Sequence, residues 1–156
     1  CAVVGNSGVL LGSRCGPEID SKDYVIRIDL PVLRGFQRDV GGRTNMTVLN
    51  LKTPLRLAQS SRFKNRSQDV YESRLRDVKD SILLADPRAR KNIINALGAI
   101  KRVTKKLHLY KTVRLVVNKL RFWNDTRKTF LEVPTAGLIT YTLASTFCDV
   151  ITLYGF

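Results

Sequence analysis

The sequence has 156 residues, the length of one ordinary domain, and its hydrophobic content of 44% excludes an intrinsically disordered chain. Lysine and arginine number 27 against 13 acidic residues, so the net charge of +14 indicates an anionic partner. The sequence contains neither a run of 18 apolar residues nor a signal peptide, and because it begins at Cys1 without Met we expect it to be part of a longer protein.

The first part of the chain alternates short apolar strands with glycine-rich loops. A strand is predicted over residues 2–4, and the loop Gly5-Asn6-Ser7-Gly8 follows it directly. Such a loop allows backbone N–H groups to approach a phosphate, although its spacing is neither that of a P-loop nor that of a dinucleotide fingerprint. Taken alone, it favours an ordinary tight turn. Further strands are predicted over residues 24–28 and 47–49.

The rest of the chain is predicted to alternate helices with strands. Asp86 and Pro87 are typical of a helix N-terminus, and an apolar stripe at helical spacing follows them. Alternation of this kind is typical of an α/β sheet. The predicted elements are a helix over 68–79, a strand over 82–84, a long helix from 86, a helix over 111–123, a buried helix over 138–147 and a strand over 150–154.

The positive charge is concentrated in the centre of the chain. Residues 51–128 carry a net charge of +15, and residues 101–128 contain ten basic residues against one acidic residue, Asp125. A solvated helix face is the plain explanation for such a run, and an anion-binding surface is the functional one. The pair Phe122 and Trp123 within it is interpreted as a core anchor rather than a stacking platform.

Glycosylation triplets favour an oxidising compartment, whereas in a cytosolic protein the three cysteines would simply be buried thiols. The triplets that begin at Asn45, Asn65 and Asn124 fit the acceptor pattern for N-glycosylation. In such a compartment three cysteines allow one disulfide within the chain and leave one cysteine for a partner outside it.

Both ends of the sequence resemble one known family. The run Cys1-Ala-Val-Val-Gly-Asn-Ser-Gly8 continues through Gly16-Pro-Glu-Ile-Asp20, Val25-Ile-Arg27 and Arg38-Asp-Val-Gly41, and it resembles the long sialylmotif of the animal sialyltransferases. The run Pro134-Thr-Ala-Gly137, Tyr141-Thr-Leu-Ala144, Cys148 and Leu153-Tyr-Gly-Phe156 resembles the short sialylmotif. The sequence of the short motif is nearest that of the α2,8 branch. The resemblance divides one partial catalytic domain, 1–156, into a long motif over 1–50, a basic variable region over 51–132 and a short motif over 133–156.

The family resemblance implies a fold and an activity. The fold is a Rossmann-like, GT-A-variant domain with a mostly parallel sheet flanked by helices, incomplete at its C-terminus. The activity is metal-independent, inverting transfer of sialic acid from CMP-sialic acid to a sialylated glycoprotein or ganglioside. The location is the luminal side of the Golgi membrane, with a type II membrane anchor outside this chain.

The resemblance also assigns roles to individual residues. Asn6, Ser7 and Gly8 match the loop that holds the phosphate and ribose of CMP, and Thr135 and Gly137 match the turn that contacts cytidine. Cys1 and Cys148 match a disulfide that joins the two motifs, and Cys15 matches a cysteine that pairs near the C-terminus, outside this chain. The general-base histidine of the family lies beyond Phe156, and the single histidine here, His108, is not assigned to catalysis.

Two donor-site positions depart from the family pattern. Asp29 stands where an asparagine amide usually donates to the nucleotide, and a carboxylate can only accept and would repel a phosphate. Ala136 replaces a threonine or serine, and the lost hydroxyl hydrogen bond is worth about 0.5–1.5 kcal/mol. Arg27 and Arg38 are interpreted as surface charges outside the site.

The basic stretch before the short motif suggests an acceptor site. Polysialyltransferases carry a basic segment at this place, so the stretch is predicted to bind a sialylated acceptor through Lys105, Lys106, Lys111, Arg114, Lys119 and Arg121. Two other functions stay open. One is a degenerate homologue that binds glycans without transfer, and the other, disfavoured by the absence of a recognisable motif, is a basic nucleic-acid-binding domain.

Overall fold

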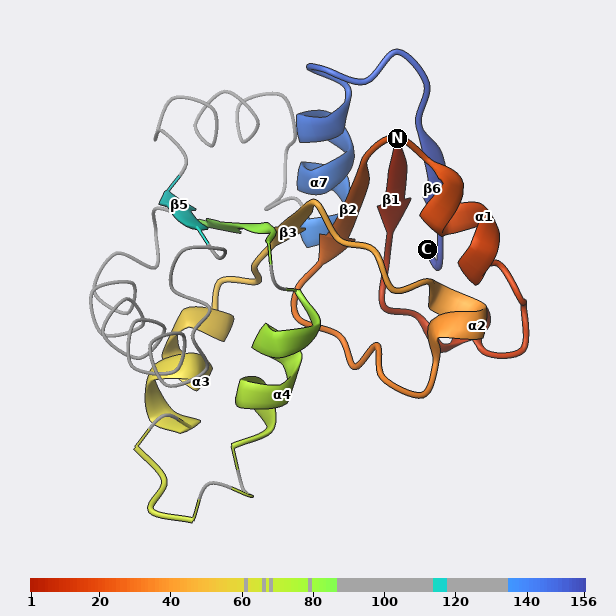
Figure 1. Ribbon diagram of the computed structural model, residues 1–156. Helices are drawn as coiled ribbons and strands as arrows, with labels where there is room; N and C mark the ends of the chain where they lie inside the picture. Colours follow the sequence, from red (N-terminus) through yellow and green to blue (C-terminus); the bar gives the residue numbers. More distant parts are fainter. Residues whose placement is uncertain (61, 66, 68, 79, 87–113, 118–134) are drawn as a thin grey trace.

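The protein forms one parallel β-sheet with helices on both faces (Figure 1), as predicted. The structure, a computed structural model, describes residues 1–156 except 61, 66, 68, 79, 87–113 and 118–134, and residues 114–117 by their backbone. The sheet order is β5-β4-β3-β2-β1-β6, and every neighbouring pair is parallel. The strands are β1 Ala2–Val4, β2 Val25–Ile28, β3 Met46–Val48, β4 Ile82–Ala85, β5 Arg114–Val117 and β6 Thr152–Tyr154.

The central strands are buried on both faces. Every residue of β1 and β2 is buried, and the apolar runs Ala-Val-Val and Val-Ile-Arg-Ile explain why these segments occupy the middle of a parallel sheet. Five of the six strands coincide with predicted ones to within one or two residues. Short apolar runs between glycine or polar residues were therefore a sufficient signal for these strands.

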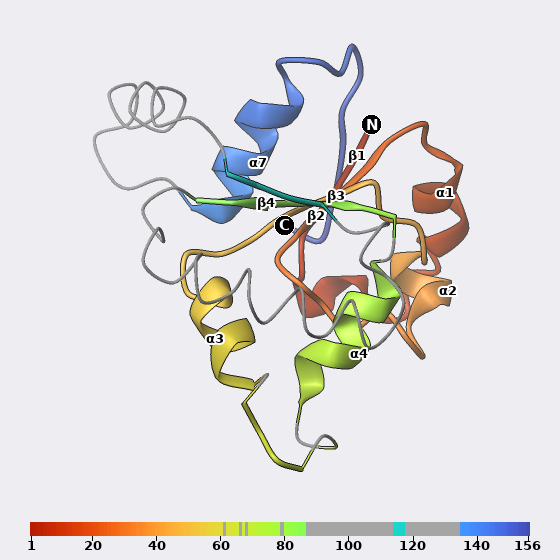
Figure 2. The same ribbon diagram turned by 60° about the vertical axis from the view of Figure 1, so that its left-hand side comes forward.

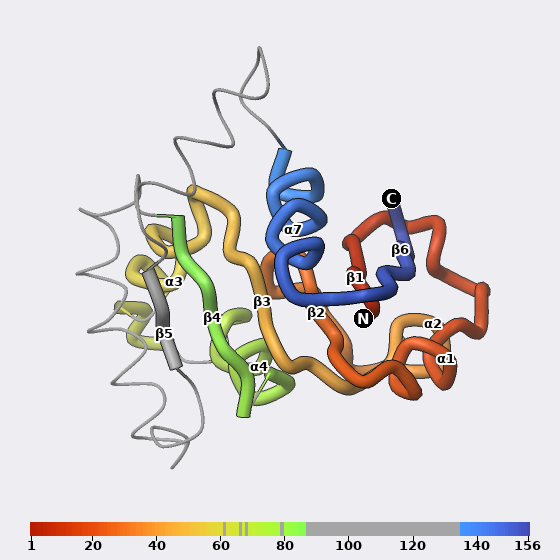
Figure 3. The backbone as a smooth tube through the Cα atoms, turned by 90° about the horizontal axis from the view of Figure 1, so that it is seen from above, coloured from red at the N-terminus to blue at the C-terminus, as the bar shows by residue number. Residues whose placement is uncertain are grey.

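Two layers of helices cover the sheet. Helices α1 Gly16–Ser21, α2 Gln37–Val40, α3 Thr53–Ser60 and α4 Val70–Asp77 lie on one face, and α7 Ala136–Ala144 lies alone on the other among the described helices (Figures 2 and 3). A 3-10 turn, η1 Gly8–Leu10, follows β1. No helix in the described ranges is long and apolar enough to cross a membrane.

The core is divided by the sheet. On the α7 face, Ala144 packs against Val3, Ile26 and Val48 from three adjacent strands. On the other face, Ile19 of α1 packs with Ala2, Val4 and Val25, and Leu57 of α3 and Leu75 of α4 pack with Leu83. Alternate residues of each strand therefore supply the two layers, as strand geometry requires.

The prediction of a helix over residues 111–123 is wrong in its centre. Residues 114–117 form strand β5, which pairs in parallel with β4. In this register Ile82 lies beside Arg114, and Ala85 lies beside Val117. The two adjacent β-branched valines favour a strand, and the pairing with the edge of β4 decides the conformation. Of the helix predicted from Asp86, only Asp86 belongs to the described residues.

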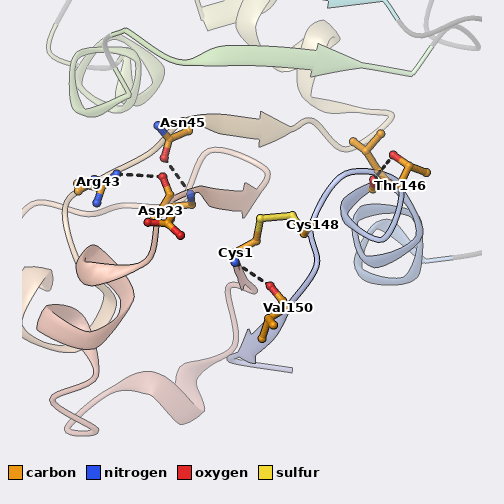
Figure 4. Close-up of a disulfide and its surroundings, with 9 residues drawn as sticks. Cys1, Asp23, Arg43, Asn45, Thr146, Cys148 and Val150 are labelled. Carbon is orange, nitrogen blue, oxygen red and sulfur yellow. Dashed lines mark hydrogen bonds between the residues drawn. A yellow bond between two sulfur atoms is a disulfide. The ribbon is translucent and has the colours of Figure 1, made fainter.

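A disulfide joins the beginning of the sheet to the end of α7. Cys1 and Cys148 are bonded with a Cα–Cα distance of 6.0 Å, which confirms the pairing that the family resemblance implied (Figure 4). The backbone nitrogen of Cys1 donates to the carbonyl of Val150 at 2.8 Å. Cys15 at the start of α1 is half-buried and not bonded to another described cysteine.

Candidate functional site

The chain changes direction across the sheet at β1. From β1 the chain adds β2, β3, β4 and β5 on one side, and it then returns to place β6 on the other side of β1. In open parallel sheets ligands bind in the crevice at the carboxyl ends of the strands where the connections diverge. The carboxyl ends of β1 and β6 are Val4 and Tyr154, so the loops that follow these two residues border the expected ligand site.

The two loops at this edge touch through glycines. The Gly5 N–H donates to the carbonyl of Tyr154 at 2.7 Å, and a Cβ on Gly5 would lie 2.2 Å from the Gly155 oxygen. Only glycine therefore fits at position 5. A Cβ on Gly8 would meet no atom within 4 Å, so Gly8 is not required by packing. The space beside Gly8, which a side chain would fill, is open to a ligand.

A cavity of about 400 Å³ lies beside this loop. Asn6, Ser7 and Gly8 are exposed and line it, together with Asp29 at the end of β2. The loop that continues from Asp29 also lines the cavity, with Leu30, Pro31, Val32 and Leu33. The structure thus brings together four of the seven residues predicted to hold the donor.

The carboxylate of Asp29 is anchored by hydrogen bonds from the loop after β3 and from the first residue of α3. Its Oδ2 accepts from Asn50 Nδ2 at 3.0 Å, and its Oδ1 accepts from Thr53 Oγ1 at 2.5 Å. Its backbone has a φ of 60°, which asparagine and aspartate tolerate better than most residues. Each oxygen therefore accepts one hydrogen bond from the protein, and the carboxylate belongs to a residue of the cavity wall.

The other three predicted residues lie at the same edge but outside the cavity lining. Thr135 caps α7, because its Oγ1 accepts from the Leu138 N–H at 3.2 Å. Ala136 and Gly137 begin the helix. A Cβ on Gly137 would lie 2.8 Å from the ring of Phe156 and 3.7 Å from Ile28 Cδ1, so this turn sits at the carboxyl ends of β2 and β6.

Arg27 belongs to the cavity wall, although the sequence analysis left it outside the site. It is 1% exposed in the centre of β2, and its Nε and Nη2 donate to the carbonyl of Arg43 at 3.1 and 2.8 Å. Burial lowers its pKa to about 10, and the nearby Asp20 opposes this shift. An arginine inside an otherwise apolar strand was the signal that could have identified it.

Asp39 on α2 fastens the far end of the glycine-rich loop. Its carboxylate accepts from the Gly12 N–H at 2.8 Å and from the Arg14 N–H at 3.0 Å. These two backbone hydrogen bonds are the main reason that the pKa of Asp39 is lowered from 3.8. The loop therefore depends on an ionised Asp39.

Replacing Asp39 with Ala is expected to speed amide exchange at Gly12 and Arg14 by about tenfold, because two charge-assisted hydrogen bonds are lost. In the wild type this protection should hold above pH 3.8 and disappear as the pH falls through the lower pKa of the folded state. Asp39→Asn keeps one acceptor oxygen, so it should give a smaller effect without the pH dependence. Exchange measured by NMR tests this, and unchanged rates in Asp39→Ala would contradict it.

The remaining predicted residues fall in different surroundings. Asn45 is half-buried, and its Oδ1 accepts from the Val25 N–H at 2.8 Å (Figure 4). Its side chain therefore satisfies a backbone donor at the start of β2. Asn65 is exposed and accepts from Ser67 Oγ at 2.7 Å. Asn124 and the basic residues of 101–128 lie outside the described part, except for the backbone of Arg114 in β5. No group of three metal-ligating side chains occurs among the residues with described positions.

Comparison with known proteins yields one family. The model of glycosyltransferase family 29 (sialyltransferase) matches residues 1–156. The human alpha-N-acetylgalactosaminide alpha-2,6-sialyltransferase 2 is 33% identical over 178 aligned residues, which cover all of this chain and 47% of that protein.

Two solved structures share the fold, both titled as a mammalian sialyltransferase and one of them in complex with Gal-beta-1-3GalNAc-ortho-nitrophenol. Each has a TM-score of 0.63 and 24% sequence identity, and the match covers all of this chain and 54% of the other. The chain thus spans about half the length of the relatives it matches.

Proposed function

The chain belongs to glycosyltransferase family 29, the sialyltransferases, and on this premise we propose that it is the donor-binding part of an enzyme that transfers sialic acid from CMP-sialic acid with inversion and without a metal. The observation that carries the proposal is the cavity lined by Asn6, Ser7, Gly8 and Asp29 at the carboxyl edge of the sheet. Exposed backbone and small polar side chains at such an edge suit a phosphate and a ribose.

We propose that the nucleotide binds at the carboxyl ends of the strands, between the loop after β1 and the start of α7. Asn6, Ser7 and Gly8 would bind the phosphate and ribose, and Thr135, Ala136 and Gly137 at the start of α7 would contact the cytidine. The described cavity lining includes no histidine. Following the family resemblance, we assign the general base, which must accept a proton from the acceptor hydroxyl, to a histidine beyond Phe156.

The linkage has two candidates. The sequence of the short motif favours an α2,8 linkage to a sialylated glycoprotein or ganglioside, with the basic segment 101–128 binding the acidic acceptor. The 33% identical relative, named an α2,6-sialyltransferase, favours an α2,6 linkage to N-acetylgalactosamine instead. Transfer by the parent protein to sialylated and to N-acetylgalactosamine acceptors separates them, and the absence of any transfer would favour a degenerate, glycan-binding homologue.

The proposed place of action is the oxidising lumen of the Golgi, with a membrane anchor outside this sequence. The disulfide between Cys1 and Cys148 and the exposed acceptor triplet at Asn65 support this location. Both features belong to proteins that pass through a secretory compartment.

Calorimetric titration of the disulfide-bonded chain with CMP tests the donor site. Saturable binding is expected at 0.15 M salt, and Asp29→Asn is expected to raise CMP affinity about fivefold, because a like charge near the phosphate costs about 1 kcal/mol in water. An asparagine there can still accept from Asn50 and donate to Thr53 Oγ1.

Asp23→Asn is the matched control, because Asp23 is exposed and precedes β2 at the opposite edge of the sheet. Equal or weaker CMP binding by Asp29→Asn would show that the hydrogen bonds of the carboxylate outweigh its charge. A short oligonucleotide is the second control: oligonucleotide binding without CMP binding would refute the donor site in favour of a nucleic-acid-binding function.

A further inference from the structure

Three arginines from different elements line the cavity. Arg27 comes from β2, Arg56 from α3 and Arg74 from α4. Asp29 is the only acidic residue among the described residues that line it. The oxygens of Asp29 accept hydrogen bonds from Asn50 and Thr53. The wall therefore carries two positive charges in excess, which favours an anion.

Two of these guanidinium groups have N–H donors without an acceptor. Arg27 is 1% exposed, and its Nη1 is buried without a hydrogen-bond partner among the described residues. Arg74 donates from Nη1 to the carbonyl of Leu30 at 2.9 Å, while its buried Nε likewise has no described partner. Buried donors are almost always satisfied in folded proteins, and here two of the arginines that line the cavity each keep an N–H group without a described acceptor.

The chemistry of the arginines indicates what that group is. A guanidinium presents N–H donors in a planar fork that fits a carboxylate or a phosphate. The proposed donor contains one phosphate, which the proposed function assigns to the loop Asn6–Gly8. Sialic acid carries a second anionic group, a carboxylate, which matches the arginines.

We propose that the wall formed by Arg27, Arg56 and Arg74 binds the carboxylate of a sialic acid residue, separately from the phosphate site at Asn6, Ser7 and Gly8. This inference rests on the proposed function. Sialic acid is the sugar of the donor, and in an α2,8 reaction it is also the end of the acceptor. Both sources present the same carboxylate.

Binding of CMP, CMP-sialic acid and α2,8-linked disialic acid to variants tests the proposal. The main variant is Arg56→Met, because Arg56 is exposed and its loss leaves the core unchanged. It is expected to weaken CMP-sialic acid or disialic acid binding about tenfold and CMP binding less than twofold, as the loss of a charge-assisted hydrogen bond predicts. Arg74→Met should change the three affinities in the same way as Arg56→Met. Arg62→Met is the control, because Arg62 is an exposed arginine outside the cavity lining.

The ligand whose affinity falls identifies the source of the carboxylate. Weaker binding of CMP-sialic acid indicates the donor sugar, and weaker binding of disialic acid indicates the acceptor. Equal weakening of CMP, no weakening of either sialic acid ligand, or no binding of these ligands by the wild type would overturn the proposal. Failure of the donor site is distinguishable. If the wild type binds disialic acid in an Arg56-dependent manner but not CMP, the carboxylate site stands and the nucleotide site is wrong; binding of neither refutes both.

Discussion

Gly5→Ala is expected to destabilise the protein by about 3 kcal/mol and to abolish CMP binding. The new Cβ would lie 2.2 Å from the oxygen of Gly155 and 3.0 Å from its carbonyl carbon. Both atoms are backbone, so they cannot rotate away as a side chain would. The carboxyl ends of β1 and β6 would have to separate, and the hydrogen bond from the Gly5 N–H to Tyr154 would be lost with them.

Gly8→Ala is the matched control for this prediction, because it adds the same methyl group three residues further along the same loop. A Cβ at Gly8 would contact nothing within 4 Å, so the free energy of unfolding should change by less than about 1 kcal/mol. Urea unfolding measures both variants. Similar stabilities of Gly5→Ala and Gly8→Ala would contradict the close contact between the two strand ends.

Removing the disulfide is expected to have the largest effect on stability. The Cys1–Cys148 bond closes a loop with a sequence separation of 147, and on the chain-entropy account such a loop contributes about 5 kcal/mol. That is of the order of the total stability of an ordinary domain, about 5–15 kcal/mol. The double variant Cys1→Ser, Cys148→Ser should therefore be largely unfolded at 37 °C.

Chemical denaturation of the oxidised protein and of the double variant measures this difference. Cys15→Ser is the control, because Cys15 is half-buried and not part of a disulfide in the described structure, and its replacement should change stability by about 0.5 kcal/mol or less. A loss below 1 kcal/mol in the double variant would show that sheet packing alone holds β1 beside β6.

Five of the six strands were predictable from the sequence, and several helices were not. Runs such as Ala-Val-Val at 2–4 and Val-Ile-Arg-Ile at 25–28 are too apolar for a surface loop and too short for a helix. Helices α1 and α2 have only six and four residues, which is too short to display a helical period. Helix α3 was missed although Pro54 in its first turn was a usable start signal.

The part of the candidate site that consists of consecutive residues was predictable. The part that is assembled from separate elements was not. Asn6, Ser7 and Gly8 follow β1 directly, so a motif of consecutive residues was enough to identify them. Arg56 and Arg74 belong to no motif, and they reach the cavity because α3 and α4 pack on the same face of the sheet.

The sequence by itself determined the class of fold, the loop after β1 and, through family resemblance, the Cys1–Cys148 pair. These features depend on neighbouring residues or on motifs that can be read along one chain. Only the tertiary structure decided that Asp29 is anchored by Asn50 and Thr53, that residues 114–117 form a strand, and that Arg27 lines the cavity. Each of these depends on parallel pairing between segments distant in sequence, and no local pattern records which side chains such pairing brings together.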